Sequence, residues 1–306
     1  MNRKSLYIKW KIKELEKNTF LYQKNLRALN MPEDVVANNW IADAIRSEKP
    51  FCLLRPGKTE YGLAMRWDEH IMFGTNRYRQ SDMFFEHLDA NIEWTEKWVN
   101  EFEQDLKDAD IFAAYGQRAI EENYLIDAYA EHPRKIWMSQ IESHYEQEKP
   151  WLKELEGKKV LVISPFTKLM RQQYERKDLI WGKWNILPDM DMKYLKAVWY
   201  MNKEENDGFE NWFDALNYMK MESRKIDFDI ALIGCGPFSS FLAADFKRRG
   251  KQAIQYGGAL QLLFGIRGER WDKNPQYQKY YNEYWTRPGE SEKPKNIKYL
   301  DDGCYW

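Results

Sequence analysis

The fold is decided by the stretch Phe228-Asp-Ile-Ala-Leu-Ile-Gly-Cys-Gly-Pro237. Its apolar run ends in closely spaced glycines, which is typical of a buried parallel strand that leads into a tight turn. After the turn, apolar residues at helical spacing predict a helix that directs its first N–H groups at the turn. Such a turn favours a phosphate or another anion. The motif lacks the third glycine of the dinucleotide fingerprint and the Gly-Lys-Ser/Thr of a P-loop, so a connection without a ligand is the alternative.

Short apolar runs alternate with helical patterns on both sides of this stretch. The predicted strands cover residues 51–55, 110–115, 135–138, 159–163, 228–233 and 252–254. Alternation of this kind implies right-handed crossovers, and it predicts an α/β fold with a doubly wound, mostly parallel, Rossmann-like sheet. Ligands of such sheets bind beyond the carboxyl ends of the strands, so the candidate site lies in the turns that follow them.

The sequence predicts an N-terminal helical region, residues 1–48, and an α/β domain, residues 49–306, with a C-terminal surface tail near residues 288–298. In the first region, apolar residues keep helical spacing from Ile8 to Leu29, and lysines flank Trp10. A basic amphipathic helix can lie on an anionic membrane, although a solvated helix face explains such charges as well. Peripheral membrane contact and a homo-oligomer both stay open at this point.

Composition narrows the classes of function. The chain has 47 basic and 48 acidic residues, which argues against a protein whose main task is to bind nucleic acid. No apolar run reaches membrane-spanning length and no signal-peptide core is present, so we expect a cytoplasmic protein. The three cysteines are scattered and the four histidines show no ligand spacing, which argues against a disulfide framework and against zinc or haem.

Three passages follow one another in a recognisable order. The first is Arg55-Pro-Gly-Lys-Thr-Glu60. The second runs from Ile141-Glu142 through Pro150-Trp151 to Phe166, and the third runs from Asp229 through Gly258 to Gly265, followed by Arg270-Trp271 and Gly303-Cys-Tyr-Trp306. Together they span most of residues 50–306. In this order they resemble the GT-D-type glycosyltransferases, whose element is Arg-x-Gly-Asp-x-Glu, and a related group of sugar transferases from bacterial surface-polysaccharide gene clusters.

The resemblance implies transfer of a sugar from a nucleotide-sugar donor to a glycan or glycolipid acceptor, in assembly of a surface polysaccharide or a glycoprotein glycan. Such an enzyme stabilises a diphosphate leaving group and deprotonates the acceptor hydroxyl. Glu60 and Glu142 are the candidate catalytic residues. The candidate donor-binding residues are Arg55, Gly57, Lys58, Ser164, Pro165, Gly234, Gly236, Pro237, Gly257 and Gly258.

Lys58 departs from the family pattern, because the resemblance places there an Asp that helps to bind a divalent cation. A protonated lysine has no lone pair for a metal. Either Arg55 and Lys58 supply positive charge directly, or Glu60 and Glu142 still bind Mn²⁺ or Mg²⁺. A third outcome is a chain that kept the fold without the activity, as a non-catalytic binding or assembly subunit of a glycosylation complex.

Other interpretations stand beside the transferase. A Rossmann-type dehydrogenase or methyltransferase is weakened because Gln255-Tyr256 stands where an acidic residue would end the strand. Arg55 and Glu60 could form a structural ion pair, and Glu142 could be a solvated carboxylate. The serine, proline and glycine candidates could serve helix initiation and backbone geometry alone.

Overall fold

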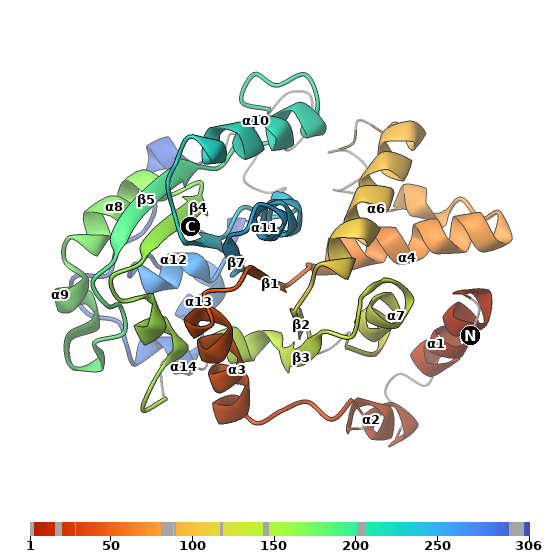
Figure 1. Ribbon diagram of the computed structural model, residues 1–306, viewed down its shortest axis with the longest axis horizontal. Helices are drawn as coiled ribbons and strands as arrows, with labels where there is room; N and C mark the ends of the chain where they lie inside the picture. The colour runs from red at the N-terminus through yellow and green to blue at the C-terminus, as the bar shows by residue number, and fades with distance from the viewer. Residues whose placement is uncertain are drawn as a thin grey trace.

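The structure is a computed structural model that describes residues 3–15, 20–27, 29–80, 88, 90–116, 119–142, 147–200, 206–293 and 303–306. Seven strands form one parallel sheet in the order β3-β2-β1-β7-β6-β4-β5 (Figure 1). The predicted α/β fold with a parallel sheet and N-terminal helices is confirmed. The strands are β1 (Phe51–Leu54), β2 (Ile111–Ala114), β3 (Arg134–Trp137), β4 (Lys159–Ser164), β5 (Asp191–Lys196), β6 (Ile230–Ile233) and β7 (Gln252–Gln255).

The side chains of each strand alternate between two cores, one on each face of the sheet. In β4, Leu161 and Ile163 face one core, whereas Val162 faces the other. Strands that are buried on both faces need continuous apolar runs, which is why their sequence signal is strong. The first face is covered by α1 (Arg3–Leu15), α4 (Lys58–Phe73), α6 (Ile92–Lys107), α7 (Ala119–Tyr129), α10 (Trp212–Arg224) and α11 (Phe238–Arg248). The second is covered by α3 (Asp34–Arg46), η4 (Trp151–Leu155), α8 (Thr167–Tyr174), α9 (Lys177–Trp181), α12 (Leu260–Leu263) and α13 (Glu269–Asp272).

Strand β5 is an element that the sequence analysis missed. It pairs with β4 along its whole length, from Lys159 opposite Asp191 to Ser164 opposite Lys196. It lies at the edge of the sheet, where Leu195 is its buried residue and charged side chains reach solvent. An edge strand therefore lacks the apolar run that marks the central strands.

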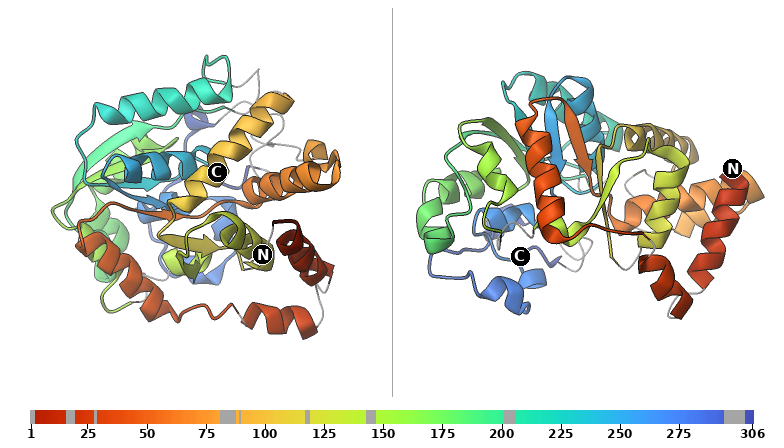
Figure 2. Two further views of the ribbon diagram at one scale, coloured as in Figure 1. Left: turned by 45° about the vertical axis from the view of Figure 1, so that its right-hand side comes forward. Right: turned by 60° about the horizontal axis from the view of Figure 1, so that its bottom comes forward.

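The N-terminal helical pattern divides into α1, α2 (Phe20–Arg27) and α3. Helix α1 packs against α7, whereas α3 packs against η4 on the other face of the sheet. Figure 2 shows α1 and α2 at the margin of the molecule. In the left view, the chain runs from α2 along the lower side of the molecule to α3. The N-terminal helices thus contribute to both layers, and the proposed boundary at residue 48 stays a prediction.

The chain beyond β7 folds against the second face. It forms α12, α13 and α14 (Pro275–Gln278), and a parallel bridge joins Ile266 to Thr286. Of the predicted surface tail, residues 288–293 are described and the rest lies outside the described residues. Pro288 is buried, whereas Gly289 and Glu290 are exposed. Among the described helices, none combines the length and apolar character needed to cross a bilayer.

Candidate active site

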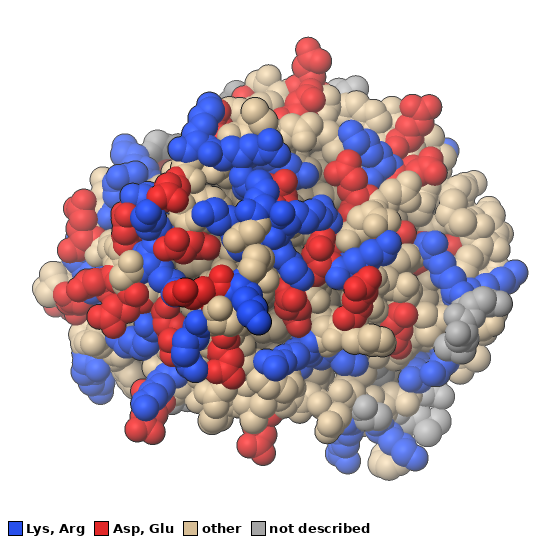
Figure 3. All heavy atoms as spheres, viewed as in Figure 1, with Lys and Arg blue, Asp and Glu red and all other residues tan. Residues whose placement is uncertain are grey.

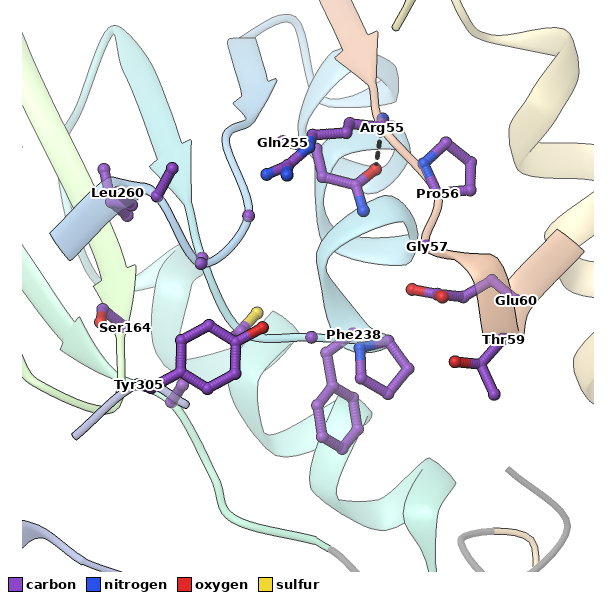
Figure 4. Close-up of a pocket in the computed structure, with 18 of the residues that line it drawn as sticks. Arg55, Pro56, Gly57, Thr59, Glu60, Ser164, Phe238, Gln255, Leu260 and Tyr305 are labelled. Carbon is purple, nitrogen blue, oxygen red and sulfur yellow. Dashed lines mark hydrogen bonds between the residues drawn. The ribbon is translucent and has the colours of Figure 1, made fainter. Parts of the chain in front are cut away.

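A cleft with a volume of about 970 Å³ opens at the carboxyl ends of β1, β7, β6 and β4 (Figure 4). This is the edge at which open parallel sheets bind ligands, and the volume suits a ligand of cofactor size. The structure brings all twelve candidate residues to this one cleft. They are Arg55, Gly57, Lys58, Glu60, Glu142, Ser164, Pro165, Gly234, Gly236, Pro237, Gly257 and Gly258.

Arg55 bridges the ends of the neighbouring strands β1 and β7. Its backbone N–H donates to Oε1 of Gln255 at 2.8 Å, as Figure 4 shows, and its Nη1 donates to the carbonyl oxygen of Tyr256. Gly257 makes this possible, because a Cβ there would lie 2.0 Å from Nη1 of Arg55, and its φ of +75° favours glycine. Gln255 therefore anchors the end of β1.

Helix α4 begins at the cleft with Lys58 as its first residue and Gly57 as its N-cap. The carboxylate of Glu60 folds back over the helix start, since a Cβ on Gly57 would lie 2.3 Å from Oε2 of Glu60. A carboxylate at the third helical position stabilises the positive end of the helix. Glu60 is buried, whereas Lys58 is exposed to the cleft. An anion that enters the cleft from solvent can therefore contact the side chain of Lys58.

Glu142 is buried, so the alternative of a solvated carboxylate is wrong. It follows η2 (Met138–Ile141), and the hydroxyl of Tyr277 on α14 donates to its Oε2 at 2.5 Å. Burial raises the pKa of Glu142, and Arg55, the Tyr277 hydroxyl and Arg270 offset part of that rise. Burial and the Glu142 carboxylate also raise the pKa of Tyr277. A carboxyl group with a raised pKa is suited to accept a proton near neutral pH.

The Gly-Cys-Gly-Pro turn between β6 and α11 packs directly against the turn after β7. A Cβ on Gly234 would lie 2.7 Å from the carbonyl oxygen of Gly257, so the two turns need glycine to approach each other. Gly236 adopts a φ of +58°. The N–H of Cys235 donates to Oγ of Ser239 in the first turn of α11. The turn thus presents backbone to the cleft, as the sequence predicts.

Cys235 lies in this turn, but its thiol is not activated as a nucleophile. Burial raises its pKa to about 12, against a smaller lowering by Ser239. At pH 8 the thiol therefore stays almost entirely protonated. We expect iodoacetamide to label the half-exposed Cys304 well before Cys235 in the folded protein, and both at similar rates in urea, as measured by peptide mass spectrometry. Equal labelling of the folded protein would contradict the raised pKa.

The C-terminal residues form a wall of the cleft that the sequence analysis did not assign to the site. The ring of Tyr305 lies over Gly258, where a Cβ would come 2.2 Å from the ring, and its hydroxyl accepts from Nη1 of Arg270 at 3.0 Å. The backbone N–H of Arg270 donates to the carbonyl oxygen of Cys304. Figure 4 shows the ring of Tyr305 among the side chains that line the cleft. Gly258 and Gly268, which both lie against this segment, are the local signals that could have indicated it.

Among the described residues that line the cleft, positive charge outweighs negative charge. They include Arg55, Lys58, Arg66 and Arg270 but only two carboxylates, Glu60 and Glu142. The whole chain, by contrast, has a net charge of −1. A cleft with this excess favours an anionic ligand such as a diphosphate.

The described side chains of the cleft do not fit a divalent cation. Among the described residues, no group of three or more His, Cys, Asp or Glu side chains could hold a metal ion. Glu60 covers Gly57, Glu142 accepts from Tyr277, and position 58 is a lysine, which has no lone pair for a metal while protonated. Arg55 and Lys58 instead place cationic groups at this position.

Comparisons with known proteins complete the description. No protein-family model and no curated protein matches the chain. Two solved structures are similar to it. One is described as a selenomethionine-substituted structure of domain of unknown function 1792, with a TM-score of 0.43, 12% identity, and coverage of 81% of this chain and 93% of that chain. The other is described as that highly conserved domain with a distinct glycosyltransferase fold, with a TM-score of 0.42, 11% identity, and coverage of 84% and 100%. Likeness at this level does not by itself establish an activity.

Proposed function

We propose that this protein is a glycosyltransferase that binds the diphosphate of a nucleotide sugar in the cleft. The observation that carries the proposal is the meeting of cationic side chains, two glycine turns and a buried carboxyl group at the carboxyl edge of the parallel sheet. The family resemblance of the same passages supports it. The acceptor would be a glycan or glycolipid in surface polysaccharide or glycoprotein glycan assembly.

The reaction assigns a task to each group. The bond between the anomeric carbon and the diphosphate oxygen breaks, and its electron pair stays on the diphosphate. Arg55 and Lys58 offset that charge. A bond forms between the acceptor oxygen and the anomeric carbon, and the hydroxyl proton passes to Glu142. Tyr277 holds Oε2 of Glu142, so we assign the proton to Oε1.

Aromatic side chains supply surfaces for the sugar and the base. Tyr115, Trp199, Tyr200, Trp271 and Tyr305 line the cleft. Such rings combine a large apolar face with a polar edge, which suits stacking on a sugar ring or a nucleobase. We propose that they contribute affinity, whereas the cationic groups fix the position of the diphosphate.

A thermal-shift panel tests the proposal. We expect a UDP- or GDP-sugar to raise the melting temperature, because a ligand at about a hundred times its Kd adds about 2.7 kcal/mol to the stability of the folded state. NAD(P) and S-adenosylmethionine are not expected to do so. Release of nucleoside diphosphate from the stabilising donor then measures turnover. Stabilisation only by NAD(P) or S-adenosylmethionine would overturn the proposal.

Lys58 favours one other function, the non-catalytic binding or assembly subunit. It replaces the carboxylate that the resembled family uses at this position. This alternative predicts that no donor is hydrolysed or transferred, with or without Mn²⁺. Donor binding without turnover, in the presence of candidate acceptors, would support it over the transferase.

A further inference from the structure

Helix α1 has apolar side chains on two opposite faces. Leu6, Tyr7 and Trp10 are buried in the core that α1 shares with α7. On the other side of the helix, at a spacing of three and four residues, large apolar side chains are exposed, and α2 begins with another. These residues, here called the N-terminal apolar surface, are Ile8, Ile12, Leu15 and Phe20, with exposed fractions of 44%, 54%, 80% and 79%.

The same segment concentrates positive charge. Residues 1–27 contain eight lysines and arginines and two glutamates, although the whole chain has a net charge of −1. Lys4 lies over the ring of Phe73, which is 44% exposed at the end of α4, with Nζ 4.9 Å from the ring centroid. At the right of Figure 3, where Figure 1 draws α1 and α4, basic side chains lie beside uncharged surface.

A second basic area lies over other helices. Figure 3 shows lysine and arginine side chains gathered near the middle of this view, where Figure 1 draws α10 and α11. Much of that charge is compensated, since Lys247 pairs with Asp110 and Arg248 pairs with Asp105 and Asp108. Part of the charge of α1 is paired as well, since Arg3 pairs with Asp68 and Glu103. The α1 and α2 segment differs in having large exposed apolar side chains beside its lysines.

We propose that α1 and α2 bind the surface of a membrane that contains anionic lipids. The N-terminal apolar surface would enter the boundary between headgroups and acyl chains, and the surrounding lysines would pair with lipid phosphates. The charge also argues against a second copy of this chain as the occupant. Two such surfaces facing each other would oppose positive charge with positive charge.

The position of α4 connects this surface to the cleft. Lys58 begins the helix at the cleft, and Phe73 ends it beside α1, with its ring centroid 5.8 Å from that of Tyr7. A helix of 16 residues is ~24 Å long. The cleft therefore lies about one helix length from α1. Lipid binding by α1 and α2 does not depend on the proposed function.

Vesicle flotation with the full chain and no donor tests the inference. We expect binding to vesicles of phosphatidylcholine and phosphatidylglycerol in a 7:3 ratio, and at least tenfold less binding to phosphatidylcholine alone. Raising the salt from 50 to 500 mM should weaken binding, because charges near the lipid surface are screened. The double variants Ile8→Ser/Ile12→Ser and Lys9→Gln/Lys24→Gln should each reduce binding at least fivefold.

Matched variants elsewhere on the surface provide the controls. Val35→Ser/Leu179→Ser removes apolar side chains that are 55% and 50% exposed, and Lys168→Gln/Lys196→Gln removes exposed charge. Both should bind vesicles as the unmutated chain does, and circular dichroism should show that all variants fold. Absence of binding at low salt would overturn the inference. So would an Ile8→Ser/Ile12→Ser variant that binds lipid normally but loses a concentration-dependent dimer, since the surface would then join two copies of the chain.

Discussion

Glu142→Gln is expected to lower the rate of sugar transfer by about 10²- to 10⁴-fold, the usual contribution of a positioned general base. Glutamine keeps the size of the side chain and an oxygen that accepts from Tyr277, so donor affinity should change little. The fall should therefore appear in kcat rather than in the donor KM. Measuring both constants with the donor identified by thermal shift checks this.

The pH profile gives an independent test of the same residue. A general base works when unprotonated, so kcat should fall as the pH drops through the pKa of Glu142, which burial raises above the usual range of a glutamate. Tyr277→Phe removes a hydrogen bond that favours the charged carboxylate, and the acid limb should then move to higher pH. An acid limb at the ordinary pKa of a glutamate, unmoved in Tyr277→Phe, would contradict the assignment.

The melting temperature of Glu142→Gln distinguishes loss of the general base from loss of the fold. Because the folded-state pKa of Glu142 is raised, its contribution to stability is present below the unfolded pKa and is lost as the pH rises through the folded pKa. Glutamine has no charge to bury, so Glu142→Gln should melt at or above the unmutated protein at pH 7.5. For turnover, Glu60→Gln is the matched control, because it neutralises the other buried carboxylate among the described lining residues. If it abolishes turnover while Glu142→Gln does not, Glu60 is the base.

Much of the fold could be predicted from the sequence because the central strands are buried on both faces. The predicted strands at 159–163 and 252–254 correspond to β4 and β7 with ends that agree within one residue. Strand β5 escaped prediction because an edge strand buries little, and tertiary pairing with β4 rather than local composition defines it. The N-terminal pattern predicted helices but not that α1 and α3 would cover opposite faces.

The candidate site, too, could be predicted only in part. The turns after β1, β6 and β7 could be predicted to meet, because parallel strands deliver their carboxyl ends to one edge of the sheet. Tyr277 could not, because it lies 135 residues from Glu142 and no local pattern joins the two. The same holds for Tyr305 and Gly258, which meet only because the end of the chain returns to the cleft.

Lys58→Ala is expected to weaken donor binding by about 1–3 kcal/mol, the range for loss of one charged hydrogen-bond partner. This corresponds to roughly a 5- to 150-fold rise in Kd. Lys58 is exposed at the start of α4 and lines the cleft, so its removal leaves no buried charge unpaired. Calorimetry or a thermal-shift titration with the donor measures the change. Lys49→Ala is the matched control, because this exposed lysine precedes the other end of β1.

Chelation of divalent cations by EDTA tests how the negative charge of the leaving group is offset. If Lys58 and Arg55 offset the diphosphate charge directly, transfer by the unmutated protein should continue in EDTA. Lys58→Asp should then impair this metal-free reaction, because a carboxylate beside the diphosphate repels it, and added Mn²⁺ should restore part of the rate. The competing account, in which Glu60 and Glu142 hold a cation, requires EDTA to abolish turnover while Lys58→Ala has little effect. Glu60 covers the start of α4 and Glu142 accepts from Tyr277, so both carboxylates are already engaged and the direct lysine contact is the expected result.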